Sequence, residues 1–437
     1  MGFSSWPTQD ELDGVRKRVA EMSGRDPQHV RVVVSPYRIC PLGAHIDHQG
    51  GTVLAMTINK GILLGFIPSS SPQVFLRSGQ FEGEVRLRVD EVQSPRETIK
   101  TNGEVHANGS TEALQECKWG NYARGALYAL RRGGYHLTQG MVGFLCGSEG
   151  LDSSGLSSSA AVGVAYLLAL EAANNLTISP TENIELDRLI ENEYLGLRNG
   201  ILDQSAVLLS SYGYLTCMNC KTKEYELVQA PGLAKNQELR RQEQYKVLLA
   251  FSGLKQSLTT NPGYNSRVSE CQEAARLLLQ ASGNEKLEPL LCNVEPDIYE
   301  AYKSNLDSKL ARRAEHYFSE NKRVSEGLKA WSSGRLEDLG RLITASGLSS
   351  IQNYECGSEP LIQLYEVLLK APGVYGARFS GAGFRGCCLA IVKASDAEEA
   401  ASFVREEYRK VQPKLASQLN QNAAVLICEA GDCAHVL

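Results

Sequence analysis

The chain of 437 residues has a net charge of −5, and 43% of its residues are hydrophobic while 22% are charged. This length suits two domains with hydrophobic cores, and the acidic balance excludes a basic surface for nucleic acid or anionic membranes, so we expect small-molecule partners. Apolar runs are too short for a membrane span, no secretory signal opens the chain, and the 12 scattered cysteines suit reduced thiols, which favours the cytoplasm.

The first half is predicted to alternate between strands and helices. A polar amphipathic helix over 9–22 opens it, and a β-branched strand over 30–34 follows. Further strands are predicted at 52–58, 62–67, 74–77, 85–89, 141–146, 214–219 and 225–227. Further helices are predicted at 119–131, 160–170, 181–193 and 204–209. The polar stretch 93–118 has no periodicity and is predicted to be a surface loop.

The charged stretch 233–244 is predicted to link two domains, an N-terminal domain over 1–232 and a C-terminal domain over 245–437. The second half begins with a strand over 245–251. Its helices are predicted at 266–281, 296–319, 321–333, 336–349, 359–370 and 396–410, and its last strands at 387–392 and 424–428. This order predicts an α/β (α+β) fold in which mixed sheets pack against helices.

A turn of small residues precedes the helix that starts near Ala160. The segment Gly150–Ala161 reads GLDSSGLSSSAA, with three successive serines at the helix start. Free backbone N–H groups at a helix N-terminus attract anions, which predicts a phosphate site. An ordinary helix cap is the alternative.

Polar side chains gather between the first two apolar strands. The stretch Ser35–Gly51 contains Arg38, His45, Asp47 and His48 among prolines and glycines. Polar groups on a loop of a rigid scaffold usually bind a ligand, although a solvated turn is the alternative.

Further candidates lie downstream. Glu191 is on a predicted helix, and Asp203 stands among apolar neighbours, where it could also cap a helix. The glycine-rich stretch 376–386 permits either close approach of the backbone to a ligand or a tight hairpin. Cys217 and Cys220 form one C-x-x-C, but without a second pair or nearby histidines they do not support a zinc or redox site.

These stretches, in this order, resemble the signature motifs of the GHMP small-molecule kinases, and among them the sugar-1-kinases related to galactokinase. Arg38–Gly51 resembles their sugar signature, Gly155–Ala160 their phosphate loop, Gly200–Gln204 their Gly-Ile-Met-Asp-Gln segment and Gly381–Gly386 their closing glycine motif. The match covers nearly the whole chain. It implies a two-domain GHMP kinase fold and ATP-dependent phosphorylation of a sugar at its C1 hydroxyl.

The resemblance also implies roles for individual residues. Asp203 would be the base or orienting carboxylate for the C1 hydroxyl, and Arg38 would stabilise charge on the reacting atoms. The sugar would be bound by Ala44, His45, Asp47, Gly200 and Tyr264. ATP would be bound by Gly155, Leu156, Ser157, Ser158, Ser159, Ala160, Gly381 and Gly383. Ser158 and Glu191 would hold Mg²⁺, so positioning and charge neutralisation would carry the phosphoryl transfer.

One departure from the family pattern bears on the substrate. Ala44 stands where galactokinases carry a Glu that contacts the C6 hydroxyl of the sugar. A carboxylate at C6 would be repelled by such a Glu, since two unit charges about 4 Å apart repel by roughly 4 kcal/mol at an effective dielectric near 20. That is on the order of a thousandfold in binding. We therefore expect galacturonate as the sugar, whereas a smaller loop packed around galactose is the alternative.

The cation that would hold the carboxylate is less evident from the sequence. Arg198, which replaces a proline of the galactokinase pattern, is the first candidate, and His48 is the second. Galactokinase or another C1 sugar kinase remains the alternative within enzymes. A non-catalytic sugar and ATP sensor is the alternative from another class, and the retention of Asp203, Arg38 and Glu191 argues against it. The sequence leaves the oligomeric state open, and a monomer is compatible with it.

Overall fold

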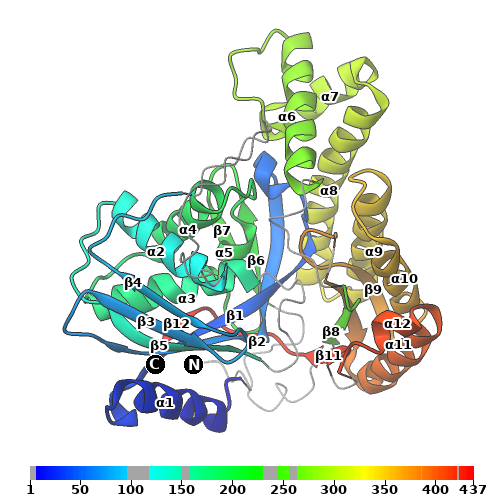
Figure 1. Ribbon diagram of the computed structural model, residues 1–437. Coiled ribbons are helices and arrows are strands. Elements are labelled where there is room, and N and C mark those ends of the chain that lie inside the picture. Colours follow the sequence, from blue (N-terminus) through cyan, green and yellow to red (C-terminus); the bar gives the residue numbers. More distant parts are fainter. Residues whose placement is uncertain are drawn as a thin grey trace, which may run out of the picture.

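A computed structural model of the chain describes residues 6–95, 118–148, 158–229, 245–254, 263–384, 386–420 and 423–437. It contains two β-sheets, each packed against helices, which confirms the predicted α/β architecture of mixed sheets and helices (Figure 1). Within the described ranges, the helices are too short or too polar to cross a lipid bilayer.

The first sheet is mixed and has eight strands. Its main path runs β12-β1-β2-β5-β3-β4, and β6 and β7 extend it from β2. The β3–β5 pair is parallel and the other pairs are antiparallel. The strands are β1 (Arg31–Leu42), β2 (Thr52–Pro68), β3 (Gln73–Ser78), β4 (Glu84–Arg88), β5 (Met141–Gly147), β6 (Tyr214–Asn219), β7 (Tyr225–Gln229) and β12 (His435–Val436).

Helices cover both faces of this sheet because successive side chains of a strand point to opposite sides. Val32 and Val34 of β1 pack with helix α1 (Gln9–Ser23), whereas Val33 between them packs with α3 (Ser158–Ala173). The remaining helices of this half are α2 (Asn121–Arg132), α4 (Pro180–Arg188), the π-helical turn η4 (Leu189–Tyr194) and α5 (Leu202–Leu209).

The second sheet is antiparallel, with the strand order β11-β8-β10-β9. Its strands are β8 (Tyr245–Phe251), β9 (Val374–Phe379), β10 (Cys387–Lys393) and β11 (Val425–Cys428). The helices of this half are α6 (Gly263–Ala281), α7 (Pro296–Tyr302), α8 (Ser308–Ser332), α9 (Leu336–Gln352), α10 (Glu359–Leu368), α11 (Ala397–Val411) and α12 (Pro413–Ala416). Helix α9 packs on β9 and also contacts β1, and α8 packs on α9 and contacts β1 and β2.

Three of the predicted boundaries were wrong. The strand predicted over 30–34 continues to Leu42, so Arg38 lies in a strand and not in a loop, and the strands predicted at 52–58 and 62–67 form the single strand β2. The break predicted near residue 320 lies earlier, because Asp307 accepts hydrogen bonds from the N–H groups of Lys309 and Leu310 and thereby starts α8.

The chain crosses between its two halves more than once. The predicted linker 233–244 and most of the predicted loop 93–118 lie outside the described residues, so the domain boundary stays a prediction. Strand β12 returns from the C-terminal end to the first sheet, where Val436 pairs with Val33 of β1. The first sheet is therefore completed by residues from both ends of the chain.

Candidate active site

Arg38 and Asp203 meet although they are far apart in the sequence. Nε of Arg38 donates to Oδ1 of Asp203 at 2.6 Å, and the side chains are 2% and 20% exposed. Pairing of β1 with β2 shifts register between Pro36 and Arg38, a bulge of the kind that redirects side chains near functional sites. Burial opposes the charge of the Arg38 guanidinium, but Asp203 raises its pKa above the usual value. The pair is thus a short, charge-assisted hydrogen bond between a buried guanidinium and a carboxylate that solvent can reach.

Asp47 lies beside this pair. It begins the 3₁₀ turn η2 (Asp47–Gln49), and its Oδ2 accepts from the backbone N–H of Leu202 at 3.4 Å. Burial and then the charge of Asp203 raise the pKa of Asp47 to about 6, against the opposing hydrogen bond from Leu202. A Cβ on Gly200 would lie 2.5 Å from Oδ2 of Asp47, so glycine is needed there for the two segments to approach. The structure therefore brings Arg38, Asp47, Gly200 and Asp203 together.

Glu191 lies fully buried in the π-helical turn η4. Ser159 and the amide of Asn199 form hydrogen bonds with its carboxylate, and burial, followed by the nearby charge of Asp203, raises its pKa to about 7. Within the described part of the chain, Oε1 of Glu191 has no hydrogen-bond partner. A buried carboxylate oxygen without a donor is costly unless a cation or a proton compensates it. π-Helical turns are frequent at functional sites.

The predicted phosphate-binding segment belongs only in part to the described residues. Gly155, Leu156, Ser157 and the side chain of Ser158 lie outside the described residues. The backbone of Ser158 starts α3, Ser159 contacts Glu191, and Ala160 is buried. Ser159 therefore lies at the N-terminus of α3 and against the carboxylate of Glu191, and the phosphate and metal roles of this segment stay predictions.

Gly381 and Gly383 form the turn between β9 and β10. Their φ angles are 71° and 75°, a left-handed conformation that favours glycine. A Cβ on Gly383 would also lie 2.7 Å from Sγ of Cys356. The stretch therefore forms a hairpin between two antiparallel strands, which was one of the two predicted alternatives. Its role in binding a ligand stays a prediction.

The β1–β2 loop, residues 43–51, carries Ala44, His45 and His48. His45 adopts a φ of 65°, and its ring stacks on Tyr354 with centroids 4.4 Å apart. Burial, and then the charge of Arg378, lowers the pKa of His45 well below its usual value. Burial also lowers the pKa of His48 to about 4. Both rings are therefore neutral at neutral pH in the ligand-free protein, and the role of His48 toward a carboxylate stays a prediction.

Tyr264 lies in the first turn of α6, and the backbone N–H of Arg198 donates to the side chain of Asn265 in the same turn. Tyr264 is near Asp47, Asp203 and Glu191, and burial followed by these carboxylates raises its pKa well above the usual value, so that its hydroxyl keeps a proton to donate. Arg198 is exposed, and its Nη1 donates to Oγ of Ser269 at 3.0 Å. The side chain of Arg198 therefore contacts the exposed Ser269 of α6.

Residues of the second half that the sequence reasoning missed hold the β1–β2 loop in place. Oε1 of Glu320 accepts from the N–H of Gly43 at 2.8 Å, and Nε2 of His316 donates to the carbonyl of Ala44 at 3.0 Å. Nε2 of His48 and the hydroxyl of Tyr354 are hydrogen-bonded at 3.1 Å. The only sequence signal for these residues is a charged or polar side chain within an otherwise apolar helix face, which does not identify a partner.

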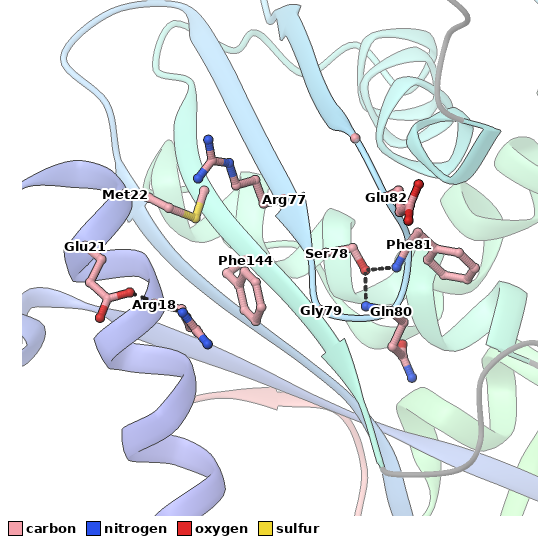
Figure 2. A pocket seen from close by; sticks show the side chains of 11 residues that line it. Arg18, Glu21, Met22, Arg77, Ser78, Gly79, Gln80, Phe81, Glu82 and Phe144 are labelled. Atoms are coloured by element: carbon pink, nitrogen blue, oxygen red, sulfur yellow. Dashed lines mark hydrogen bonds and ion pairs between the residues drawn. The ribbon is translucent and has the colours of Figure 1, made fainter.

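A cavity of about 550 Å³ lies away from all of these residues. It opens between the C-terminal part of α1 and the turn after β3, with Met22 and Phe144 on one side and Ser78 and Gln80 on the other (Figure 2). Arg18 and Arg77 at its rim are exposed and already paired with Glu21 and Glu84. None of the candidate site residues lines this cavity.

Comparison with known proteins places these residues in a family context. The profile of the GHMP kinases N terminal domain matches residues 121–211, and the profile GHMP kinases C terminal matches residues 325–410. The chain is 68% identical to galacturonokinase of Arabidopsis thaliana over 433 residues, covering 99% of this chain and 100% of that protein. It is 33% identical to galactokinase of Limosilactobacillus fermentum, covering 86% of this chain and 89% of that protein.

Solved structures agree with these sequence matches. Galactokinase of Lactococcus lactis, complexed with galactose, superposes with a TM-score of 0.80 at 28% identity, covering 97% of this chain and 99% of that one. Mevalonate kinase of Methanococcus jannaschii superposes with a TM-score of 0.57 at 15% identity, which shows a common fold alone.

Proposed function

The chain belongs to the GHMP kinases, and from this premise we propose that it transfers the γ-phosphoryl group of ATP to the C1 hydroxyl of D-galacturonate. The products are galacturonate 1-phosphate and ADP. The observation that carries the substrate is the 68% identity to galacturonokinase over the whole of that protein. The observation that carries the chemistry is the Arg38–Asp203 pair, with Oδ1 2.6 Å from Nε.

Asp203 is the group that takes the proton. The C1 oxygen attacks the γ-phosphorus, the bond to the oxygen that bridges the β- and γ-phosphates breaks, and the hydroxyl proton passes to the carboxylate of Asp203. Arg38 orients this carboxylate and compensates charge on the reacting atoms. Such a transfer depends on positioning and charge neutralisation more than on covalent help from the protein. General-base assistance typically contributes about 10²–10⁴-fold.

The sugar lies between the β1–β2 loop and the start of α6. Asp47, which is ionised at neutral pH because its pKa is about 6, accepts hydrogen bonds from sugar hydroxyls, and Tyr264 donates one. Gly200 keeps the backbone close to Asp47, and the neutral ring of His45 supplies a hydrogen-bonding nitrogen. Ala44 faces the C6 end, where a carboxylate meets a methyl group and not an acid.

Glu191 and the start of α3 hold the nucleotide end. Oε1 of Glu191 is buried without a partner among the described residues and fits a divalent cation. Mg²⁺ is usually bound by one or two carboxylates together with phosphate oxygens and water, and it would neutralise phosphate charge there. The segment Gly155–Ala160 and the turn with Gly381 and Gly383 cradle the phosphates of ATP. The described cysteines are free, which supports a reducing compartment such as the cytoplasm.

Galactokinase activity is the second candidate, because the structure of galactokinase with galactose superposes over nearly the whole chain. The test is to incubate the purified protein with MgATP and either galacturonate, galactose or glucuronate, and to follow ADP release. We expect the highest kcat/KM with galacturonate. Faster turnover of galactose would refute the proposed substrate but leave the kinase assignment, whereas no turnover of any sugar would favour a non-catalytic sensor.

A further inference from the structure

A buried cluster of charges lies beneath the β1–β2 loop. Glu320 on α8 and Arg378 on β9 are 0% exposed, and Arg323, one turn after Glu320, is 14% exposed. Nε of Arg323 lies 2.7 Å from Oε2 of Glu320, and Nη1 of Arg378 lies 3.5 Å from Oε1. The same Oε1 accepts the backbone N–H of Gly43, the residue before Ala44, at 2.8 Å.

The charges of this cluster do not cancel. Two guanidinium groups face one carboxylate, and among the described residues neither arginine has an ion-pair partner other than Glu320. Ser346, Ser350 and the carbonyl of Phe379 satisfy the remaining donors of Arg378, and these groups are neutral. One positive charge is therefore left over within about two hydrogen-bond lengths of Gly43.

The neighbouring histidine rings are neutral and therefore do not change the net charge of the cluster. His316 on α8 donates a hydrogen bond to the carbonyl of Ala44, and burial lowers its pKa to about 4. After burial, the charge of Arg378 is the next cause that lowers the pKa of His45. The field of the cluster thus reaches the β1–β2 loop, and burial keeps it from being screened by salt as surface charges are.

We propose that Arg323 and Arg378, paired on Glu320, provide the countercharge that lets the pocket accept a carboxylate at C6 of the sugar. This inference rests on the proposed function, since it assumes that Ala44 faces C6. An acidic side chain at residue 44 would neutralise the excess positive charge of the cluster from within the protein. With Ala44 the substrate's own carboxylate balances it, so neither Arg198 nor His48 is needed. The two arginines act through space as specificity residues and do not contact the reacting atoms.

The size of the effect follows from Coulomb's law. One unit charge about 8 Å from the carboxylate, at an effective dielectric near 20, changes binding by roughly 30-fold. A neutral sugar should not sense it. The ratio of the affinities for galacturonate and galactose is therefore the quantity to measure, because a purely structural disturbance would weaken both sugars alike.

The test compares Arg323→Gln with Arg323→Lys by calorimetric titration with each sugar in the absence of ATP. Arg323→Gln keeps a donor to Glu320 but removes the excess charge, and we expect the galacturonate affinity to fall about 30-fold while the galactose affinity is unchanged. Arg323→Lys should restore the wild-type ratio. Equal weakening of both sugars, or an unchanged ratio in Arg323→Gln, would overturn the proposal.

A second variant shifts the charge in the opposite direction. Glu320→Gln keeps an oxygen to accept from Gly43 and raises the excess to two charges, so the ratio should move toward galacturonate. A ratio that stays constant or moves toward galactose would overturn the proposal, and melting curves check that each variant is folded. Failure of the proposed function would appear differently, as a wild-type protein that neither binds nor phosphorylates galacturonate.

Discussion

Replacing Ala44 by Glu should abolish the preference for galacturonate. Ala44 is 7% exposed, and the backbone on both sides is fixed, because Glu320 holds the N–H of Gly43 and His316 holds the carbonyl of Ala44. With Ala44 facing C6 of the sugar, as proposed, a Glu side chain at this position would bring its carboxylate close to that of galacturonate. Two carboxylates about 4 Å apart at an effective dielectric near 20 repel by roughly 4 kcal/mol, or about a thousandfold in binding.

Ala44→Gln is the matched control, since it adds the same bulk without the charge. We would measure kcat/KM for galacturonate and galactose with wild type and both variants by following ADP release. The Glu variant should lose on the order of a thousandfold with galacturonate and little with galactose, and the Gln variant should lose much less with galacturonate. Equal losses in both variants would mean that bulk decides, and no loss in either would mean that residue 44 is remote from C6.

Asp203→Asn should lower kcat about 10²–10⁴-fold while calorimetric binding of galacturonate persists, because the amide keeps the shape but takes no proton; an unchanged kcat would contradict the assigned role. Gly200→Ala should raise KM about tenfold or more, since its Cβ would lie 2.5 Å from Oδ2 of Asp47. Gly14→Ala, whose Cβ meets nothing within 4 Å, should be silent in the same assay. Burial raises the pKa of Glu171 to about 7, so the folded state retains a proton that the unfolded state releases above its model-peptide pKa of about 4.5. The free energy of unfolding should fall by roughly 3 kcal/mol as pH rises from about 4.5 to 7, and urea titrations of Glu171→Gln should show a flatter pH profile.

The sequence was most informative where chemistry and backbone requirements coincide. Arg38, Asp47, Gly200 and Asp203 were identified from motifs, and the structure brings these four together. Their distances could not be predicted, because they depend on how β1 bends at its bulge and where α5 begins. Local patterning reports which residues are polar, but it does not report which of them meet.

The wrong predictions of where strands and helices begin and end have physical reasons. The proline at residue 36 suggested the end of a strand, yet β1 passes through it at a register shift where the missing N–H is tolerated. The helix break predicted near residue 320 is absent, because Glu320 and Arg323 lie inside α8 and pair with each other. Inward-facing charges cannot be distinguished from solvated ones without knowing that Arg378 and Gly43 lie opposite.

The hydrogen bonds that shape the β1–β2 loop have a consequence for biosynthesis. Gly43 precedes its partner Glu320 by 277 residues, and His45 precedes Cys356 by 311. At translation speeds of about 5–20 residues per second, the loop emerges from the ribosome roughly a quarter of a minute to a minute before Glu320 is made. A nascent or truncated chain that ends before α8 therefore contains Arg38 but lacks Glu320 and Cys356, so the β1–β2 loop gains these contacts only when the second half docks.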